Sequence, residues 1–586
     1  MTHIHDDPSS FKDDVTTGFA AAYARYVERV PDASGFLRRG GPLAGKVSLV
    51  VGGGSGHYPS YGGIVGAGFA DACVLGEVFS SPSSEQIYRV GRAADGGGGI
   101  VLSFGNYAGD RLNFAAAQER LVADGVDTRI VYVTDDIASA AKDEADRRRG
   151  IAGTFAVYKI GGAVADRGDD LDTVERLMRA ANAATFSFGV AFSGCTLPGQ
   201  DRPLFQVEEG RMEFGLGIHG EPGTRSSPWL PAPQLAEELV RVVLAERPTA
   251  ASGRAAVVVN GLGATKYEEL FLLYGHVDRL LTAAGVEAVQ PEVGELVTSL
   301  DMAGCSLSVT WLDDELEQGW TAPADTVSFR RGQVGAPVAG RPAALQDRAS
   351  PSRVATTASE DSTDGEVASE ESIAAAAVAR AALHAMSAVV RQNEERLGQI
   401  DAVAGDGDHG IGMVRGLGAA CAAADASGGG IGTVLSAAGA AFGDKAGGTS
   451  GILWGVMLGS AGSTLGDRGQ VTRSEIGTAV RAGAEALQRV GKAEPGDKTM
   501  LDALLPFVDV LQERLDANDQ LPDAWAAAAS AAVAAADATA PLVPRIGRAR
   551  PLAERSVGTP DPGAISMGLV LTAVGEVLTE TSRMQP

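Results

Sequence analysis

Residues 47–57, VSLVVGGGSGH, place a short apolar run directly before a glycine-rich stretch that ends in a histidine. Similar runs lead into polar loops at residues 100–110, IVLSFGNYAGD, and at residues 129–136, RIVYVTDD. Such runs are typical of buried strands in an α/β sheet, where ligands gather beyond the carboxyl ends of the strands. Another run, AAVVVNGLG at residues 255–263, precedes an amphipathic segment around residues 267–281. We therefore expect an N-terminal α/β region of two lobes that share one site.

The length of the chain requires more than one domain. A single hydrophobic core stops growing at roughly 250–300 residues, and this chain has 586. Residues 335–371 are rich in Pro, Ala, Ser and Thr, turn acidic, and contain almost nothing that forms a core. From Ser372 onward the sequence is Ala-rich, with apolar residues at helical spacing and no convincing strand. We predict a two-lobed α/β domain over residues 1–334, a linker over 335–371 and an all-α domain over 372–586.

Composition excludes several classes of protein. Hydrophobic residues make up 45% and charged residues 21%, as in globular proteins. The 49 Lys and Arg against 74 Asp and Glu give a net charge of -25, which disfavours binding to nucleic acid or to an anionic membrane. None of the four cysteines belongs to a CxxC pair, and the N-terminal MTHIHDDPSSFKDD lacks the features of a signal peptide. We found no uninterrupted apolar run near 18 residues and expect a cytoplasmic protein.

Two histidines stand in glycine-rich segments. His57 ends GGGSGH, where glycines let backbone N–H groups approach a ligand and the histidine can act as base or donor; a plain tight turn is the alternative. His219 lies in GLGIHG at residues 215–220, which formally fits GxGxxG. The following EPGTRSSP cannot open the helix that a dinucleotide pyrophosphate needs, so we reject that interpretation. A histidine flanked by glycines has no apolar core to fill, and we interpret His219 as a functional residue.

Three carboxylates are concentrated in residues 401–410, DAVAGDGDHG. Asp401, Asp406 and Asp408 would repel one another unless a hard cation lay between them, which predicts Mg²⁺ with substrate phosphates completing its shell. An EF-hand is excluded because no Glu stands at position twelve of either possible loop. A solvated acidic turn remains the alternative.

Further glycine-containing loops follow in the Ala-rich region. They are GGTSG at residues 447–451, PGDKTM at 495–500, GRAR at 547–550 and DPGA at 561–564. Each alone fits a helix cap or turn. Together with the acidic loop they supply what a nucleotide site without a Walker motif needs.

Seven motifs, in this order, resemble those of the dihydroxyacetone kinase family in its single-chain, ATP-dependent form: GGGSGH, NYAGD, GIHGEPG, GDGDHG, GGTSG, PGDKTM and DPGA. The resemblance covers essentially the whole chain. It implies a two-lobed α/β K domain that binds a ketose, and an L domain that is a barrel of antiparallel helices with ATP and two Mg²⁺ ions at one end. It also implies a homodimer.

The resemblance assigns roles residue by residue. His219 resembles the residue whose imidazole adds to the substrate carbonyl as a hemiaminal. His57 and Asp110 resemble the pair that binds the reacting hydroxyl and removes its proton. The implied substrate-binding residues are Gly54, Ser55, Gly56, Tyr58 and Gly105. Asp401, Asp406 and Asp408 match the Mg²⁺ ligands. The implied nucleotide-binding residues are His409, Gly410, Ile411, Gly412, Thr449, Ser450, Gly496, Met500, Arg548, Asp561, Pro562 and Gly563.

Two departures from the family pattern bear on the substrate. Tyr58 stands where these kinases usually have Glu, and Gly105 stands where they usually have Lys. Loss of the Lys removes a donor and opens volume, which favours a four-carbon ketose, D-erythrulose, with D-erythrulose 4-phosphate as product. Alternatives left open are a dihydroxyacetone or glyceraldehyde kinase, an L-erythrulose kinase, a subunit that senses ketose or works with a phosphocarrier, and an FMN-forming cyclase side activity.

Overall fold

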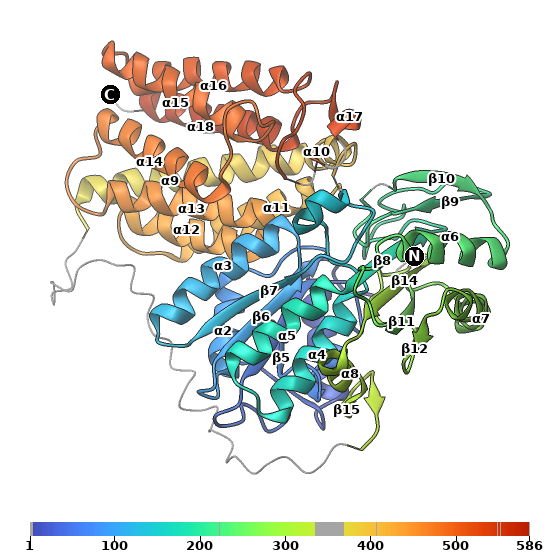
Figure 1. Cartoon of the computed structure of the whole chain (residues 1–586). Helices are drawn as coiled ribbons and strands as arrows, with labels where there is room; N and C mark the ends of the chain where they lie inside the picture. The colour runs from blue at the N-terminus through green and yellow to red at the C-terminus, as the bar shows by residue number, and fades with distance from the viewer. Residues whose placement is uncertain are drawn as a thin grey trace. The chain divides into compact units, whose positions relative to one another are not determined.

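The computed structural model describes residues 4–221, 223–333, 368–405, 407–547, 549–550 and 553–584. The chain divides into two compact units, Met1–Pro351 and Ser352–Pro586. The first is α/β and the second helical, as the sequence predicts (Figure 1). Most of the predicted linker lies outside the described residues. Its last residues, Glu370 and Glu371, instead form the first turn of a helix, because the Ser369 hydroxyl caps that turn by accepting from the Ser372 N–H at 3.1 Å.

The first lobe of the α/β unit is built on a six-stranded sheet of order β1-β2-β5-β3-β6-β7. Strands β3, β5, β6 and β7 are parallel, and β1 and β2 extend the sheet in antiparallel pairing. Helices α2 and α3 pack on the face that carries Val50 and Leu102, whereas Leu49 and Val51 on the other face are also fully buried. Burial on both faces explains the uninterrupted apolar runs in the sequence. The elements of this lobe are α1 (Phe11–Ala22), β1 (Val27–Arg29), β2 (Gly35–Arg38), β3 (Ser48–Ser55), η1 (Gly62–Ile64), β5 (Ala72–Val78), α2 (Ser84–Ala94), β6 (Ile100–Gly105), α3 (Ala108–Ala123), β7 (Thr128–Val133), η2 (Lys142–Arg147), α4 (Thr154–Arg167) and α5 (Leu171–Ala183).

The glycines of GGGSGH do not form a loop directly after a strand, and this corrects the sequence-based expectation. Strand β3 continues to Ser55, and Gly52, Gly53 and Gly54 pair with β5. A Cβ at Gly54 would lie 2.6 Å from the Ser80 backbone nitrogen, so the strand needs glycine there for close approach rather than for a turn. The turn begins at Gly56, where φ is 103°.

The second lobe contains a seven-stranded sheet of order β10-β9-β8-β14-β11-β12, with β13 also paired to β11. Helices α6 and α7 cover the face formed by residues such as Val257 and Leu307. The predicted strand and helix near residues 255–281 are therefore confirmed. The elements are β8 (Thr185–Ala191), β9 (Arg211–Phe214), β10 (Arg225–Pro228), α6 (Ala232–Leu244), β11 (Arg254–Gly261), α7 (Tyr267–Ala283), β12 (Glu287–Ala288), β13 (Glu292–Gly294) and β14 (Gly304–Trp311). The chain then returns to the first lobe, where α8 (Asp314–Thr321) packs against α4 and α5. Strands β15 (Ala324–Thr326) and β16 (Arg330–Arg331) follow and form a small sheet with β4 (Gly66–Ala67).

The second unit is helical throughout its described residues. From α11 to α16 each helix contacts the next, and α18 returns to α9, which in turn contacts α11, so the helices close into a barrel. This confirms the predicted all-α class, in which short loops join antiparallel neighbours. The helices are α9 (Glu370–Gln392), α10 (Glu394–Asp401), α11 (His409–Ala426), α12 (Ile431–Ala446), α13 (Gly448–Leu465), α14 (Arg473–Gly491), α15 (Leu501–Asp516), α16 (Leu521–Ala538), α17 (Ala553–Ser556) and α18 (Pro562–Met584).

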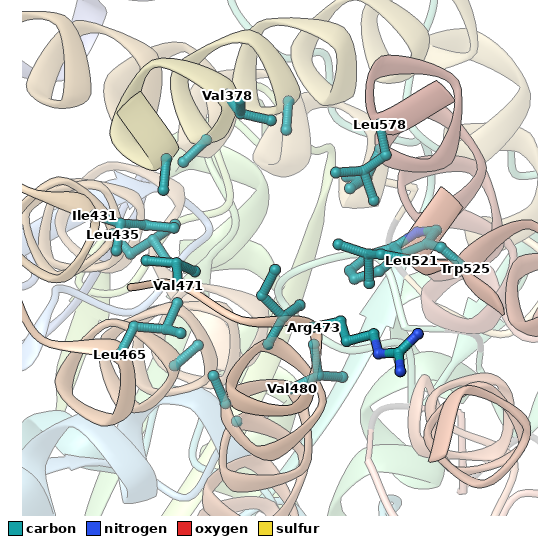
Figure 2. Close-up of a pocket in the computed structure, with 18 of the residues that line it drawn as sticks. Val378, Ile431, Leu435, Leu465, Val471, Arg473, Val480, Leu521, Trp525 and Leu578 are labelled. Carbon is teal, nitrogen blue, oxygen red and sulfur yellow. The ribbon is translucent and has the colours of Figure 1, made fainter. Parts of the chain in front are cut away.

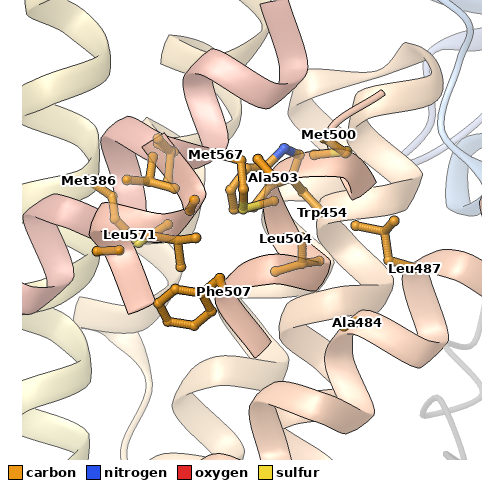
Figure 3. Close-up of a cluster of buried hydrophobic side chains, with 14 of the residues drawn as sticks. Met386, Trp454, Ala484, Leu487, Met500, Ala503, Leu504, Phe507, Met567 and Leu571 are labelled. Atoms are coloured by element: carbon orange, nitrogen blue, oxygen red, sulfur yellow. The ribbon is translucent and has the colours of Figure 1, made fainter. Parts of the chain in front are cut away.

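Part of the barrel interior is tightly packed and part is hollow. Figure 3 shows Trp454, Phe507 and Met567 among the buried side chains of the packed core, where each is at most 1% exposed. A cavity of about 750 Å³ lies among the helices, lined by apolar side chains that include Ile431, Leu465 and Leu578 (Figure 2). Many of its other lining residues are alanines, whose small side chains leave the space unfilled.

Two helices of this unit, α9 and residues Pro562–Arg583 of α18, are long and apolar enough to cross a membrane by length and composition alone. Both also supply buried residues to the barrel core, such as Met386 and Leu571. The four cysteines are buried and free, as predicted, and burial raises the pKa of Cys73 to about 12.

Candidate active site

The candidate active site of the α/β unit lies beyond the carboxyl ends of β3 and β6, where segments of the second lobe join it. His57 follows β3, and His219 comes from the irregular segment between β9 and β10. The two imidazoles meet with their Nε2 atoms 3.0 Å apart. The two lobes thus share one site. The described residues after His219 lead into strand β10 and not into a helix, which agrees with the rejection of a dinucleotide loop.

The partners of the two histidines determine where their protons lie. His57 Nδ1 is 2.7 Å from the Thr298 carbonyl oxygen, and His219 Nδ1 is 3.3 Å from Glu221 Oε1. A carbonyl and a carboxylate only accept, so both Nδ1 atoms donate. The Nε2–Nε2 contact then requires one further proton between the rings. Together the two histidines carry one positive charge, and only one of them is neutral at a time.

The histidine pair is buried and enclosed by aromatic rings. His57 is 1% exposed and His219 7% exposed. Phe79 stacks on His57 with ring centroids 5.1 Å apart, and Tyr107 meets His219 edge-on at 4.5 Å. Burial, with the neighbouring charge of His219, lowers the pKa of His57 to about 3. His57 is therefore the neutral member of the pair near pH 7.

Three residues behind His219 were not assigned a role from the sequence. They are Glu221, Arg149 and Asp136, all buried. Glu221 Oε2 is 3.6 Å from Arg149 Nη1, and Arg149 Nη2 is 2.8 Å from Asp136 Oδ2. Glu221 stands two residues after His219 in GIHGEPG, and Asp136 ends the polar loop RIVYVTDD. Arg149 ends an ordinary basic run, RRR, and nothing local marks it.

The other predicted residues of this unit lie in different surroundings. Asp110 is buried in the first turn of α3, and its charge adds to burial in raising the pKa of Tyr61. The Ser55 hydroxyl donates to the Gly76 carbonyl at 2.7 Å. The Tyr58 side chain is half exposed and meets the Phe19 ring edge-on, with ring centroids 6.0 Å apart. Their assignment to the substrate stays a prediction.

Gly105 ends β6 next to Tyr107. A Cβ at this position would lie 3.1 Å from the Gly150 carbonyl oxygen and 3.1 Å from the Tyr107 ring. The space that a side chain would need is therefore already occupied in part. This revises the expected reason for the glycine: it lets Tyr107 and the Gly150 backbone approach β6, rather than simply leaving a void.

The helical unit brings together carboxylates from two of its predicted motifs. Asp401 ends α10, Asp408 precedes α11 and Asp561 precedes α18. Burial, together with the charge of Asp401, raises the pKa of Asp408 to about 7. Burial and the charges of Asp401 and Asp502 raise the pKa of Asp561 to about 7. Oxygen ligands that repel one another in this way fit a divalent cation of the Mg²⁺ type. Asp406, the third predicted ligand, lies outside the described residues.

Several helices of the barrel begin close to these carboxylates. His409, the first residue of α11, contacts the Ser566 hydroxyl of α18 through Nε2 at 2.9 Å. A Cβ on Gly563 would lie 3.3 Å from the Met500 Cβ, which places the starts of α18 and α15 side by side. Helix N-termini carry free N–H groups and partial positive charge, so their convergence favours phosphate.

The predicted nucleotide residues lie at these helix starts. Thr449 and Ser450 occupy the first turn of α13, after Gly447 and Gly448 with φ of 63° and 59°. Gly496, with φ of 88°, donates its N–H to Asp502 Oδ1 at 2.5 Å. The first turn of α11 consists of His409, Gly410, Ile411 and Gly412, and α18 begins with Pro562 and Gly563. Arg548 lies outside the described residues.

A small cavity of about 150 Å³ lies among Asp401, Thr499, Gly547 and Asp561. Lys498, which the sequence analysis did not single out, is buried at its edge. Its ammonium donates to the carbonyl oxygens of Ala540, Leu542 and Ser556 at 3.3, 3.1 and 2.6 Å. Lys498 thereby holds the segment that leads from α16 to α18 next to the carboxylates.

One unit thus holds a buried histidine pair, and the other holds carboxylates among helix N-termini. This arrangement fits a kinase whose predicted acceptor-binding and nucleotide-binding residues belong to different units. The Dak1 domain family matches residues 17–328, and the DAK2 domain family matches residues 403–576.

Known proteins resemble the chain over its full length. The D-erythrulose kinase of Mycolicibacterium smegmatis is 51% identical over 582 residues, 99% of each chain. The L-erythrulose kinase of Pectobacterium atrosepticum is 49% identical over 601 residues, 100% of this chain and 98% of that one. The crystal structure of the dihydroxyacetone kinase from C. freundii with AMP-PNP and Mg²⁺ matches with a TM-score of 0.52 at 28% identity, covering 98% of this chain and 99% of that one. The chain belongs to the dihydroxyacetone kinase family and is an ATP-dependent kinase of its single-chain form.

Proposed function

We propose that this kinase phosphorylates a terminal hydroxyl of D-erythrulose to give D-erythrulose 4-phosphate, through a hemiaminal on His219. The observation that carries the proposal is the buried His57–His219 pair, in which Glu221 holds His219 Nδ1 and leaves Nε2 to meet a carbonyl. The erythrulose kinases that resemble the chain at about 50% identity support a four-carbon ketose.

A covalent bond to the carbonyl carbon selects ketoses and aldoses over polyols such as glycerol, and it fixes the terminal hydroxyl for in-line attack. His57, with its low pKa, stays neutral near pH 7 and can take the hydroxyl proton; Asp110 is its predicted partner. Two Mg²⁺ ions, held by Asp401, Asp406 and Asp408, would neutralise the phosphate charge when bound.

The family resemblance further supports a homodimer located in the cytoplasm. The net charge of -25 favours a protein that binds neither nucleic acid nor an anionic membrane. Its partners would be the ketose and ATP.

The test is ATP turnover by the purified protein against D-erythrulose, L-erythrulose, dihydroxyacetone, D-glyceraldehyde and glycerol. We expect the highest kcat/KM with D-erythrulose, slower turnover of dihydroxyacetone and none of glycerol, with the product identified by NMR. A preference for L-erythrulose would overturn the stereochemistry alone. Equal or better turnover of dihydroxyacetone would show that the protein is a dihydroxyacetone kinase without the proposed preference for erythrulose. FMN release from FAD, without ketose, would reveal the cyclase activity.

Replacing Gly105 by Lys is expected to shift the kcat/KM ratio toward dihydroxyacetone by about tenfold or more, because the amine fills space and adds a donor. Total activity should also fall, since a side chain here presses on Tyr107 and Gly150. The matched control is Gly105→Ala, which adds the crowding without the amine. An equal shift in both variants would show that crowding, rather than the amine, sets the preference.

A further inference from the structure

Glu221 is held from several directions against His219. Its Oε2 accepts the His219 backbone N–H at 3.1 Å, and its Oε1 contacts His219 Nδ1 at 3.3 Å. Arg149 stands on its far side, and Asp136 fixes Arg149 through both Nε and Nη2, at 3.0 and 2.8 Å. Charges therefore alternate from Asp136 through Arg149 and Glu221 to the histidine pair.

The glycine of GLGIHG that lies two residues before His219 makes room for this carboxylate. A Cβ on Gly217 would lie 2.1 Å from Glu221 Oε2 and 2.7 Å from Arg149 Nη1. The φ of Gly217 is not in the left-handed region, so space rather than conformation requires glycine. In the motif GLGIHG, glycine at position 217 therefore makes room for the ion pair of Glu221 and Arg149 next to His219, and not for a dinucleotide.

The surroundings keep Glu221 ionised. Burial opposes the charged form, but Arg149 and His219 outweigh it and lower the pKa of Glu221. The other groups that face this carboxylate are His57 on the far side of His219, Asp136 beyond Arg149, and the Tyr107 hydroxyl, which has no hydrogen-bond partner among the described residues. An anionic Glu221 can only accept, so His219 Nδ1 must carry a proton.

We propose that Glu221, seated by Gly217 and held by Arg149 and Asp136, is the positioning residue that fixes His219 as its Nδ1–H tautomer and stabilises the imidazolium formed on addition to the ketose. The proposal rests on the hemiaminal of the proposed function. It extends that function by assigning the carboxylate, the guanidinium and the glycine that orient the nucleophile.

The addition balances in charge and protons. Before the attack the proton between the rings moves from His219 Nε2 to His57 Nε2, which leaves His219 neutral with a lone pair on Nε2. That lone pair forms the bond to the carbonyl carbon, and the π electrons of the carbonyl move to its oxygen. The oxygen then takes the proton from His57 Nε2. His219 keeps its Nδ1–H and becomes an N-substituted imidazolium beside Glu221, while His57 is left neutral with a free Nε2 lone pair. The pair carries one positive charge before and after the step.

The first test is Glu221→Gln in the full-length protein, with ¹⁵N-histidine NMR of the ketose-free state and titration with erythrulose. A Gln amide can donate to Nδ1, so we expect His219 to change to the Nε2–H tautomer. Adduct affinity and kcat/KM should fall by up to about 10⁴-fold, the loss in kcat seen when a catalytic histidine loses the carboxylate that sets its tautomer. Glu221→Asp, which keeps the charge, should recover part of the loss.

The matched control is Glu246→Gln. Glu246 pairs with Arg148, the neighbour of Arg149, at 3.2 Å. This variant should keep the tautomer and kcat/KM within about twofold of the wild type. An unchanged His219 tautomer in Glu221→Gln would overturn the positioning role, as would an equal loss in Glu246→Gln. Absence of any ketose adduct in the wild type would instead overturn the proposed function, and the NMR result would still decide the role of Glu221.

A second variant tests whether Gly217 makes room for Glu221, and it leaves the carboxylate itself unaltered. Gly217→Ala should displace Glu221, change the His219 signals and weaken the adduct at least tenfold. Gly275→Ala on α7, where a Cβ would meet nothing within 4 Å, is its control and should behave as the wild type. If Gly217→Ala also keeps the wild-type signals and affinity, Gly217 does not seat the carboxylate and the proposal fails in that part.

Discussion

His219→Ala should lower kcat/KM for the ketose by about 10³-fold or more and abolish the covalent adduct with the protein. In the proposed mechanism Nε2 of this residue is the nucleophile, and His57, which donates from Nδ1 to the Thr298 carbonyl oxygen, cannot take its place. Intact-protein mass spectrometry measures the adduct. In the wild type it should be reversible, and it should not form with glycerol.

His276→Ala is the control for this substitution. His276 lies on α7 of the same unit and contacts Arg279 at the surface. We expect normal turnover and a normal adduct. An adduct of wild-type yield in the His219→Ala protein would place the nucleophile on another residue.

Asp408→Asn is expected to lower kcat by about 10³-fold or more, while the ketose adduct on His219 forms as in the wild type. Asp408 is a predicted ligand of the metal that neutralises phosphate charge, and it belongs to the unit that lacks the histidine pair. Steady-state kinetics at saturating Mg²⁺ and ATP, together with mass spectrometry of the adduct, separate the two effects.

Stability gives an independent readout for the same variant. Without divalent cations, Asp408 and Asp401 repel each other, which contributes to the raised pKa of Asp408. Above pH 7 the metal-free Asn variant should therefore unfold at an equal or higher urea concentration than the wild type. The control is Asp425→Asn near the end of α11, where the carboxylate pairs with His384 at the surface. Loss of the ketose adduct in Asp408→Asn would contradict the division of roles between the units.

Strand positions were predictable where both faces of a strand are buried, because such a strand needs an uninterrupted run of apolar residues. Strands β3 and β6 are covered on both faces, so they appear as continuous apolar runs. The continuation of β3 through Gly52–Ser55 was missed because glycine has no strand preference. Pairing with β5 decides the conformation there, and that is a tertiary effect.

The two histidines of the candidate site could be singled out from the sequence, but their arrangement could not. Glycine-rich surroundings marked both His57 and His219, yet the residues are 162 positions apart and only the fold brings their rings together. Arg149 carries no local signal, since a basic run occurs on many protein surfaces, and Asp136 has only its place in the polar loop that follows β7. In the helical unit each loop showed its Gly, Asp or Thr, but the convergence of the helix starts depends on closure of the barrel.

The cavity among the barrel helices also matters for protein engineering. Its alanine lining residues include Ala374, Ala375, Ala379, Ala382, Ala461 and Ala479. A larger apolar side chain at one of these positions would bury new surface, worth about 0.8 kcal/mol per methylene group where it fits without strain. The described lining of the cavity contains none of the predicted nucleotide or metal residues. Thermal stability of this unit can therefore be raised from its interior while the chemistry at the helix starts is left untouched.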